Sequence, residues 1–347
     1  MRQLPAWAAA GLCGSAPPAH AALDIAALES AAAAADLHSL MVWQRGELLM
    51  QHHRRSRDRP GGSWFAREVD FGPDVLHDMR SISKSVIGLL VGQAVGRGEV
   101  DITTPVVEHF PELQSLRGGP QQAITVAHLL NMTAGLVWNE EIGTYGRAAN
   151  DETRLASDPA PWGYILDRAL AHPPGQVWLY NGGCTVLLAE IVQRRGGRPW
   201  LDRVREDLFL PLGIQRFAWR TGAHGQPMAY AGLRLSAADL PLLGRLMLDS
   251  GRWHGRQLVP ADWVAATLQG QATVGRGPMR YSQQWWNGTV LHQGRTLSTT
   301  VGIGNGGQRL FIVPALGLLV VLTAGQYNSP AIGPLQAKLL RQIVAML

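Results

Sequence analysis

The sequence is short of cysteine and lysine and contains no long apolar run. Cys13 and Cys184 are its only cysteines, too few for a disulfide framework or a cysteine zinc site. The apolar stretch that starts at Leu316 has about half of the ~20 residues that a membrane helix needs, so we expect no membrane span. With 46% hydrophobic and 16% charged residues, the chain is predicted to be globular rather than disordered.

Arginine supplies nearly all of the positive charge. The net charge is +5 and the sequence pI is about 9.6, but the arginines are scattered and do not alternate with aromatic residues. This pattern does not favour nucleic-acid binding. Lys84 and Lys338 are the only lysines, so a lysine at either position needs an explanation.

The first residues are typical of a secretory signal. Arg2 is followed by an apolar stretch from Leu4 to Cys13, interrupted by Pro5, and an AHA tripeptide ends at Ala21. We therefore predict a signal peptide over residues 1–21 and a periplasmic or secreted protein. An alanine-rich leader on a cytoplasmic protein is the alternative.

Patterns of β-strands lie at both ends of the chain. Residues 38–53 predict two strands around a turn at Arg45 to Glu47, and residues 309–325 predict two more, joined at Pro314 to Gly317. Segments that begin at Asp24 and Gly333 predict helices that pack on the same sheet.

The middle of the chain carries helical periodicity punctuated by glycine and proline. We predict one domain over residues 22–347, of the α+β class. Its α/β lobe takes residues 22–80 and 291–347, and a mostly helical lobe of residues 81–290 is inserted between them.

Lys84 follows Ser81 by three residues where apolar periodicity begins. The pair is expected at the start of a helix and on one face, where hydroxyl and amine can meet. Serine is a weak nucleophile unless a base takes its proton. Lysine can be that base when burial and a helix N-terminus lower its pKa, whereas arginine cannot be deprotonated. The alternative is that Ser81 is a helix cap and Lys84 a solvated residue.

Several blocks of the sequence occur together in one family. The stretch from Val75 to Leu113, the stretch ITVAHLLNMTAGLVWNE from Ile124, and a later stretch from Leu235 resemble the β-lactamase-related serine hydrolases. That superfamily includes class C β-lactamases, D-alanyl-D-alanine carboxypeptidases, esterases and 6-aminohexanoate-dimer hydrolases. The resemblance implies a β-lactamase/transpeptidase-like fold and Ser81 as the nucleophile.

The family's second motif places a tyrosine beside the serine, and Tyr180 matches it. A phenol near Lys84 can relay a proton between the serine and the leaving group. The motif's usual polar third residue is replaced by Gly182, so Asn181 is the candidate to contact substrate. Without Ser81 and Lys84, Tyr180 would be interpreted as a buried aromatic residue.

The third motif, usually a cation, a small residue and glycine, corresponds to Gly302, Ile303 and Gly304. Position 302 therefore has no cation to hold a substrate carboxylate. The resemblance implies that the backbone amides of Ser81 and Asn305 form the oxyanion hole. A plain glycine-rich hairpin is the alternative for this segment.

Other residues carry weaker signals. Trp138 and Trp286 can line a substrate pocket or fill the core. His52 and His53 point to opposite faces of a strand and cannot share a metal ion. His128 is expected to be structural. Glu140 and Glu141 are interpreted as a solvated loop.

Together these features predict a serine hydrolase that cleaves a small ester or amide through an acyl-enzyme, without a cofactor or metal. Two alternatives remain: a β-lactamase or D-amino peptidase acting on cell-wall substrates, and a non-catalytic module that binds or senses cell-wall fragments. The sequence leaves the oligomeric state open.

Overall fold

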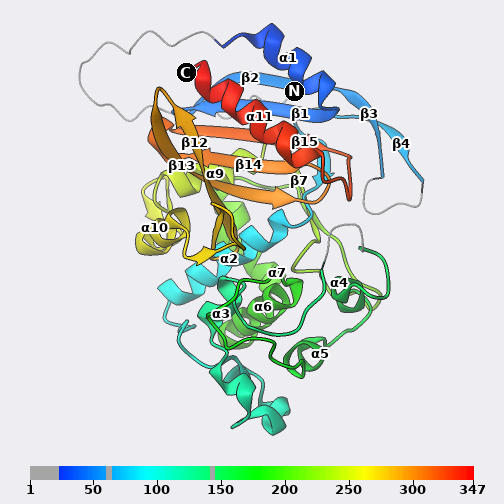
Figure 1. Ribbon diagram of the computed structural model, residues 1–347, viewed down its shortest axis with the longest axis vertical. Helices are drawn as coiled ribbons and strands as arrows, with labels where there is room; N and C mark the ends of the chain where they lie inside the picture. Colours follow the sequence, from blue (N-terminus) through cyan, green and yellow to red (C-terminus); the bar gives the residue numbers. More distant parts are fainter. Residues whose placement is uncertain (1–22, 60–64, 141–144) are drawn as a thin grey trace.

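An antiparallel eight-stranded sheet forms one side of the protein and a group of helices the other (Figure 1). The structure is a computed structural model, and it describes residues 23–59, 65–140 and 145–347. The predicted signal peptide lies outside these ranges. No helix among the described residues is long and apolar enough to cross a membrane.

The sheet joins both ends of the chain, as the sequence predicted. Its strand order is β10-β11-β12-β13-β14-β15-β1-β2. The strands are β1 (Leu37–Gln44), β2 (Glu47–His53), β10 (Ala272–Thr273), β11 (Arg280–Ser282), β12 (Trp285–His292), β13 (Arg295–Gly304), β14 (Gln308–Val313) and β15 (Leu318–Ala324).

Both predicted hairpins are confirmed. The β1–β2 turn passes through Arg45 and Gly46, with φ of 49° and 88°, the left-handed conformation that tight hairpins need. The central pairing of β1 with β15, which aligns Val42 with Val320, links the two ends of the chain.

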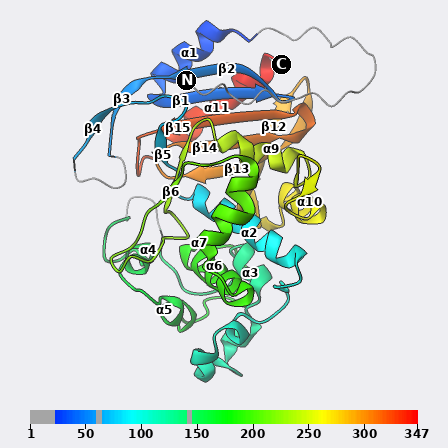
Figure 2. The same ribbon diagram turned by 180° about the vertical axis from the view of Figure 1, so that it is seen from behind.

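The sheet has a different core on each face. In β1, Leu40 and Val42 belong to one core, while Met41 and Trp43 belong to the other, because successive side chains of a strand point to opposite faces. Helices α1 (Ile25–Ala34) and α11 (Ile332–Ala345) cover the first face, and α2 (Ile82–Gly96) and α9 (Leu240–Leu248) lie on the second (Figures 1 and 2). The predicted packing of both terminal helices on the sheet is confirmed.

The inserted helical lobe is shorter than the predicted range of 81–290. Strands β10, β11 and β12 belong to the main sheet, and α10 (Ala261–Gln269) packs against them. Two of these strands have only two or three residues, too few to show a period of two in the sequence.

Shorter elements complete the two lobes. The remaining strands are β3 (Arg55–Asp58), β4 (Arg67–Asp70), β5 (Leu76–Asp78), β6 (Ala218–Trp219), β7 (Leu233–Ser236), β8 (Arg252–Trp253) and β9 (Arg256–Gln257). The helical lobe holds α3 (Val126–Leu130), α4 (Asp151–Leu155), α5 (Trp162–Leu166), α6 (Gly182–Gly196), α7 (Trp200–Arg203), η5 (Val204–Phe209) and α8 (Leu210–Leu212). The 3₁₀ turns in the described part of the chain are η2 (Val106–His109), η3 (Pro111–Leu116), η4 (Pro120–Ala123) and η6 (Pro314–Leu316).

Helix α2 runs through the centre of the molecule between the sheet and α6. Every residue from Ile82 to Ala94 is buried, so this helix is apolar on all sides rather than amphipathic. Gly88 lies against the backbone of Gln283, where a Cβ atom would come within 2.2 Å of the carbonyl oxygen. Close packing on several sides therefore holds the N-terminus of α2 in one position.

Strand β13 comes very near the turn that leads into α2. A Cβ atom on Gly304 would lie 2.4 Å from the backbone oxygen of Met79, so only glycine allows this approach. The next residue of the turn, Arg80, has a φ of 50°, which costs energy for a non-glycine residue. The end of β13 and the start of α2 are thereby held together.

We predict that Gly304→Ala destabilises the protein by about 1–3 kcal/mol, because the added methyl group meets backbone rather than a movable side chain. Gly302→Ala is the matched control on the same strand. Its Cβ atom would make only ordinary contacts, at 3.5 Å from Ile82 and Trp285. Urea unfolding of both variants measures the difference. Equal stabilities would contradict the close approach of β13 to Met79.

Candidate active site

Ser81 and Lys84 lie together at the N-terminus of α2. Lys84 Nζ is 3.3 Å from Ser81 Oγ and donates a 3.0 Å hydrogen bond to the backbone oxygen of Tyr230. Ser81 occupies the N-cap position without a side-chain capping bond, so its hydroxyl is available. Lys84 is 1% exposed, which rules out the solvated first-turn alternative.

Tyr180 completes the predicted group. It lies just before α6, its ring centroid is 4.7 Å from Lys84 Nζ, and the side chains of Ser81 and Lys84 both act on its phenol. Asn181, the predicted substrate contact, is buried, and its side chain accepts a 3.2 Å hydrogen bond from the Cys184 amide at the start of α6. Asn181 therefore acts as a helix cap in this structure.

Glu140 is buried beside Lys84, and its interpretation as a solvated residue is wrong. Its Oε1 atom lies 3.8 Å from Lys84 Nζ, and its side chain is fully enclosed. Its Oε2 atom accepts hydrogen bonds from the Trp138 indole at 2.9 Å and the Gly182 amide at 2.5 Å. These donors hold a carboxylate against the cation. Glu141 lies outside the described residues.

A second acid, Glu152, borders the first. Burial is the main cause that raises the pKa of Glu152 to about 8; the charge of Glu140 contributes in the same direction, and the Lys84 cation partly opposes both. Glu152 therefore keeps its proton at neutral pH and forms a side-chain hydrogen bond with Glu140. The Glu140 carboxylate faces the ammonium group of Lys84 at 3.8 Å.

The expectation that Lys84 has a lowered pKa is wrong for this site. Burial is the largest single influence and lowers the pKa of Lys84, but the interactions with Tyr180, Glu140 and Glu152 together raise this pKa above the ordinary lysine value. Sequence spacing revealed the burial of Lys84 but not the acids that surround it. In the resting site Lys84 is an ammonium group.

The pKa of Tyr180 is also raised. Burial is the main cause, the charge of Glu140 adds to it, and the Lys84 cation and the Ser81 hydrogen bond oppose it. Tyr180 is therefore a neutral phenol at neutral pH. Because Lys84 and Tyr180 are in contact, they titrate as a pair, and removing one proton from the pair produces a base next to Ser81.

A pocket of about 370 Å³ opens beside Ser81. Aromatic and aliphatic side chains dominate its wall, and β13 with the loop after it supplies one edge. The lining residues include Trp178, Trp286, Ile303, Asn305, Pro330 and Ile332. The predicted place of Trp286 and Asn305 at the site agrees with this lining, whereas Trp138 lies behind Glu140 in the core.

A more polar pocket of about 240 Å³ meets the first at Ser81, Tyr145 and Asn305. Arg80 and Glu152 also line it. Asn305 is held in place because its side chain bonds both the amide and the side chain of Asn328, each at 2.7 Å. The nucleophile thus lies between an apolar and a polar compartment.

Arg309 supplies the apolar pocket with a cation. It lies on β14, beside Ile303 of the motif strand, and donates hydrogen bonds to the backbone oxygens of Gly304 and Gln308 at 3.0 and 2.8 Å. Burial lowers its pKa to about 10, so it stays charged at neutral pH. Within the described ranges it forms no ion pair with a carboxylate.

Sequence reasoning missed four residues of the site: Glu140, Glu152, Tyr145 and Arg309. The sequence did contain a signal for Glu140, because this residue ends the family block that starts at Ile124, two residues after Trp138. The other three lie in segments without a motif. The described residues contain one group that could hold a metal ion, His38, Asp58 and His77, and none of these three lines either pocket.

Two proteins of known activity are similar to this chain in sequence. A 6-aminohexanoate-dimer hydrolase of Paenarthrobacter ureafaciens is 31% identical over 72% of this chain and 66% of its own length. Esterase EstB of Burkholderia gladioli is 29% identical over 50% of this chain and 45% of its own length. The chain thus matches less than two thirds of either relative.

Solved structures share the fold. A penicillin-binding protein homologue from Caulobacter crescentus superposes with a TM-score of 0.71 at 19% identity, covering 96% of this chain and 99% of that one. The family model described as Beta-lactamase matches residues 26–345. The chain therefore belongs to the Beta-lactamase family, whose relatives found here include hydrolases of amides, esters and β-lactams.

Proposed function

We propose that this protein is a serine hydrolase that cleaves an ester or amide through an acyl-enzyme on Ser81. The observation that carries the proposal is the contact of Ser81 Oγ with Lys84 Nζ, with the Tyr180 ring beside the same ammonium group, where two pockets meet. A substrate needs space on both sides of its scissile bond, and the two pockets offer it.

The reaction has two steps. Ser81 Oγ attacks the carbonyl carbon while its proton passes to the Lys84–Tyr180 pair. The backbone amides of Ser81 and Asn305 hold the oxyanion, the bond to the leaving group breaks, and the leaving group takes the proton from the pair. Water then attacks the acyl carbon by the same route, releases the acid and restores Ser81.

The reactive form holds one proton fewer than the resting form. Lys84 is an ammonium and Tyr180 a phenol at neutral pH, so neither accepts the serine proton until the pair has lost one. Ammonium with phenolate and amine with phenol are two arrangements of that reactive form. Glu140 favours the ammonium and stabilises the first arrangement.

The pocket linings define a substrate class. An apolar acyl or leaving group fits between Trp178, Trp286 and Ile332, and Arg309 can bind an anionic group at the far end of the molecule. Position 302 has no cation, so this anchor lies on the neighbouring strand instead. We propose a small ester or amide for which a carboxylate improves binding without being required.

The non-catalytic alternative differs at the second step. A module that binds or senses a ligand would at most be acylated once on Ser81, whereas an enzyme turns over. A fluorophosphonate probe should label the peptide containing Ser81, and steady release of product from an ester distinguishes the enzyme from the sensor.

We predict that Lys84→Met lowers turnover of p-nitrophenyl butyrate by about 10²–10⁴-fold, because the variant lacks the proton-transfer pair. Lys338→Met, which removes the chain's only other lysine, is the matched control and should retain full activity. Peptide mapping after exposure to the fluorophosphonate should show Ser81 labelled in the control only. A loss of less than tenfold in folded Lys84→Met would exclude Lys84 from proton transfer.

We predict that activity rises with pH on the alkaline side of neutrality, and that Glu140→Gln moves this rise to lower pH. The Glu140 carboxylate raises the pKa of both Lys84 and Tyr180, so its removal lets the pair lose its proton sooner. Profiles of kcat/KM against pH for wild type and variant measure the shift. A shift to higher pH would contradict the assigned role of Glu140.

We predict that Arg309→Gln weakens use of anionic substrates selectively. For p-nitrophenyl hemisuccinate, kcat/KM should fall by about 10-fold or more relative to p-nitrophenyl butyrate, since a charge-assisted hydrogen bond contributes about 1.5–3 kcal/mol. Arg309→Lys should restore part of the ratio. The ratio removes any general loss caused by the hydrogen bonds of Arg309 to the backbone, and an unchanged ratio would refute the anchor.

A further inference from the structure

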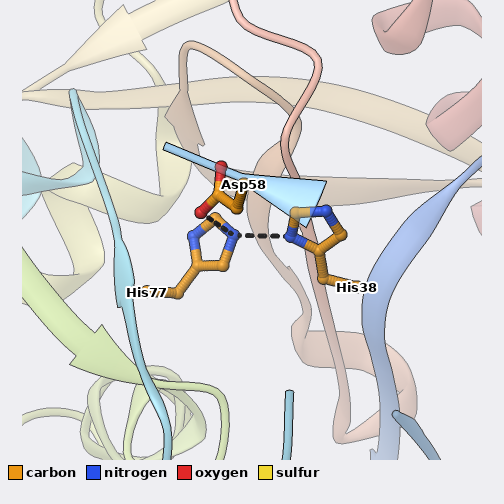
Figure 3. A group of neighbouring side chains, drawn as sticks. All are labelled: His38, Asp58 and His77. Atoms are coloured by element: carbon orange, nitrogen blue, oxygen red, sulfur yellow. Dashed lines mark hydrogen bonds and ion pairs between the residues drawn. The ribbon is translucent and has the colours of Figure 1, made fainter. Parts of the chain in front are cut away.

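Three buried side chains from three different sheets meet outside both pockets (Figure 3). His38 lies on β1 of the main sheet, Asp58 on β3, and His77 on β5. His38 Nδ1 is 3.0 Å from His77 Nε2, which is 4.0 Å from Asp58 Oδ2. One ligand atom from each residue lies within 4.8 Å of the others.

The hydrogen bonds of His77 determine which of its nitrogens has a free lone pair. His77 Nδ1 lies 3.1 Å from the backbone oxygen of Asp78, an acceptor, so Nδ1 carries the ring proton. The lone pair is then on Nε2, which faces His38 and Asp58. A backbone carbonyl that orients an imidazole in this way is the usual outer contact of a metal-binding histidine.

A metal ion binds the neutral form of an imidazole. Burial is the main cause that lowers the pKa of His77 to about 4, and the nearby arginines Arg234 and Arg80 lower it further. Burial also lowers the pKa of His38 to about 4, with the neighbouring His77 adding to the effect.

The Asp58 carboxylate is buried without a matching cation among the described residues. Arg54, the arginine near His38, pairs with Asp36 at 3.0 Å. The arginines near His77 converge on Asp78 instead, with Arg234 at 2.8 Å. Asp58 Oδ1 has no hydrogen-bond partner in the described part of the chain. An unpaired buried carboxylate is costly, and a bound cation would remove that cost.

Tyr327 is a further neighbour of Asp58. Burial and the charge of Asp58 raise the pKa of its phenol, so it is neutral. Its buried hydroxyl interacts with the Asp58 side chain. This hydroxyl or a water molecule can complete a fourfold set of ligands.

We propose that His38, Asp58 and His77 bind a divalent transition-metal ion, Zn²⁺ by the chemistry of the donors, as a structural site separate from catalysis. Two imidazole nitrogens and one carboxylate are a common ligand set for this ion. Bonds of about 2.0–2.2 Å place tetrahedral ligands about 3.3–3.6 Å apart. The two histidines would separate slightly and Asp58 would move inward.

Metal binding would replace the hydrogen bond between His38 and His77 with bonds from both rings to the ion. The His38–His77 hydrogen bond is lost, and the His38 proton moves to Nε2 so that Nδ1 can coordinate. The arginines gathered at Asp78 oppose a second positive charge, so affinity should be lower than in a four-ligand structural site. The ion would connect β1, β3 and β5. His77, its ligand on β5, stands four residues before Ser81 in the sequence.

The test uses the full-length, tag-free protein after dialysis against EDTA. We expect one equivalent of Co²⁺ to produce the visible absorption of a tetrahedral ion, and Zn²⁺ to displace it and raise the Tm. Asp58→Asn should abolish both effects. Asp70→Asn is the matched control, because Asp70 is exposed on the adjacent strand β4 and should bind metal as wild type does.

Two results would overturn the site. One is wild-type protein that takes up no more Co²⁺ than Asp58→Asn. The other is a Tm that Zn²⁺ does not change in folded wild type. Wild-type binding is informative even if Asp58→Asn fails to fold, and far-ultraviolet circular dichroism reports folding in each sample.

Discussion

The ion pair between Lys84 and Glu140 is the interaction on which the site depends. An ammonium group without solvent costs several kcal/mol unless a charge and hydrogen bonds compensate it. Glu140 supplies the charge, and the Tyr230 carbonyl and the Ser81 hydroxyl accept hydrogen bonds. Tyr180 then stands against a cation that can stabilise its phenolate. Glu140 offsets the free-energy cost of burying Lys84. Because it also raises the pKa of Lys84 and of Tyr180, it influences the pH above which the site can accept the proton of Ser81.

The fold brings these groups together from distant parts of the chain. Helix α2 carries the serine and the lysine, the start of α6 positions Tyr180, and β13 forms the edge of the pocket. Gly304 permits the contact between β13 and the turn before α2. A rigid sheet and a fully buried helix are suited to this task, because small displacements at a catalytic group cost large factors in rate.

Local patterns predicted much of this arrangement. The two hairpins, both terminal helices and the pairing of Ser81 with Lys84 follow from periodicity and from a spacing of three residues within one helix. The predicted helical lobe was longer than the observed one, because strands of two or three residues cannot show the two-residue period of a β-strand in the sequence. Glu140 was misread because a carboxylate in a loop looks the same in sequence whether it faces water or a buried lysine.

The sequence by itself determined the family, the nucleophile, its lysine and its tyrosine, since these depend on residue identity and near-neighbour spacing. Only the tertiary structure decided the charge state of Lys84, the compensating acids and the place of Arg309 in the pocket wall. The reason is physical: a pKa depends on burial and on charges within a few ångströms. Those charges come from segments up to about 70 residues away along the chain, and no local pattern records that proximity.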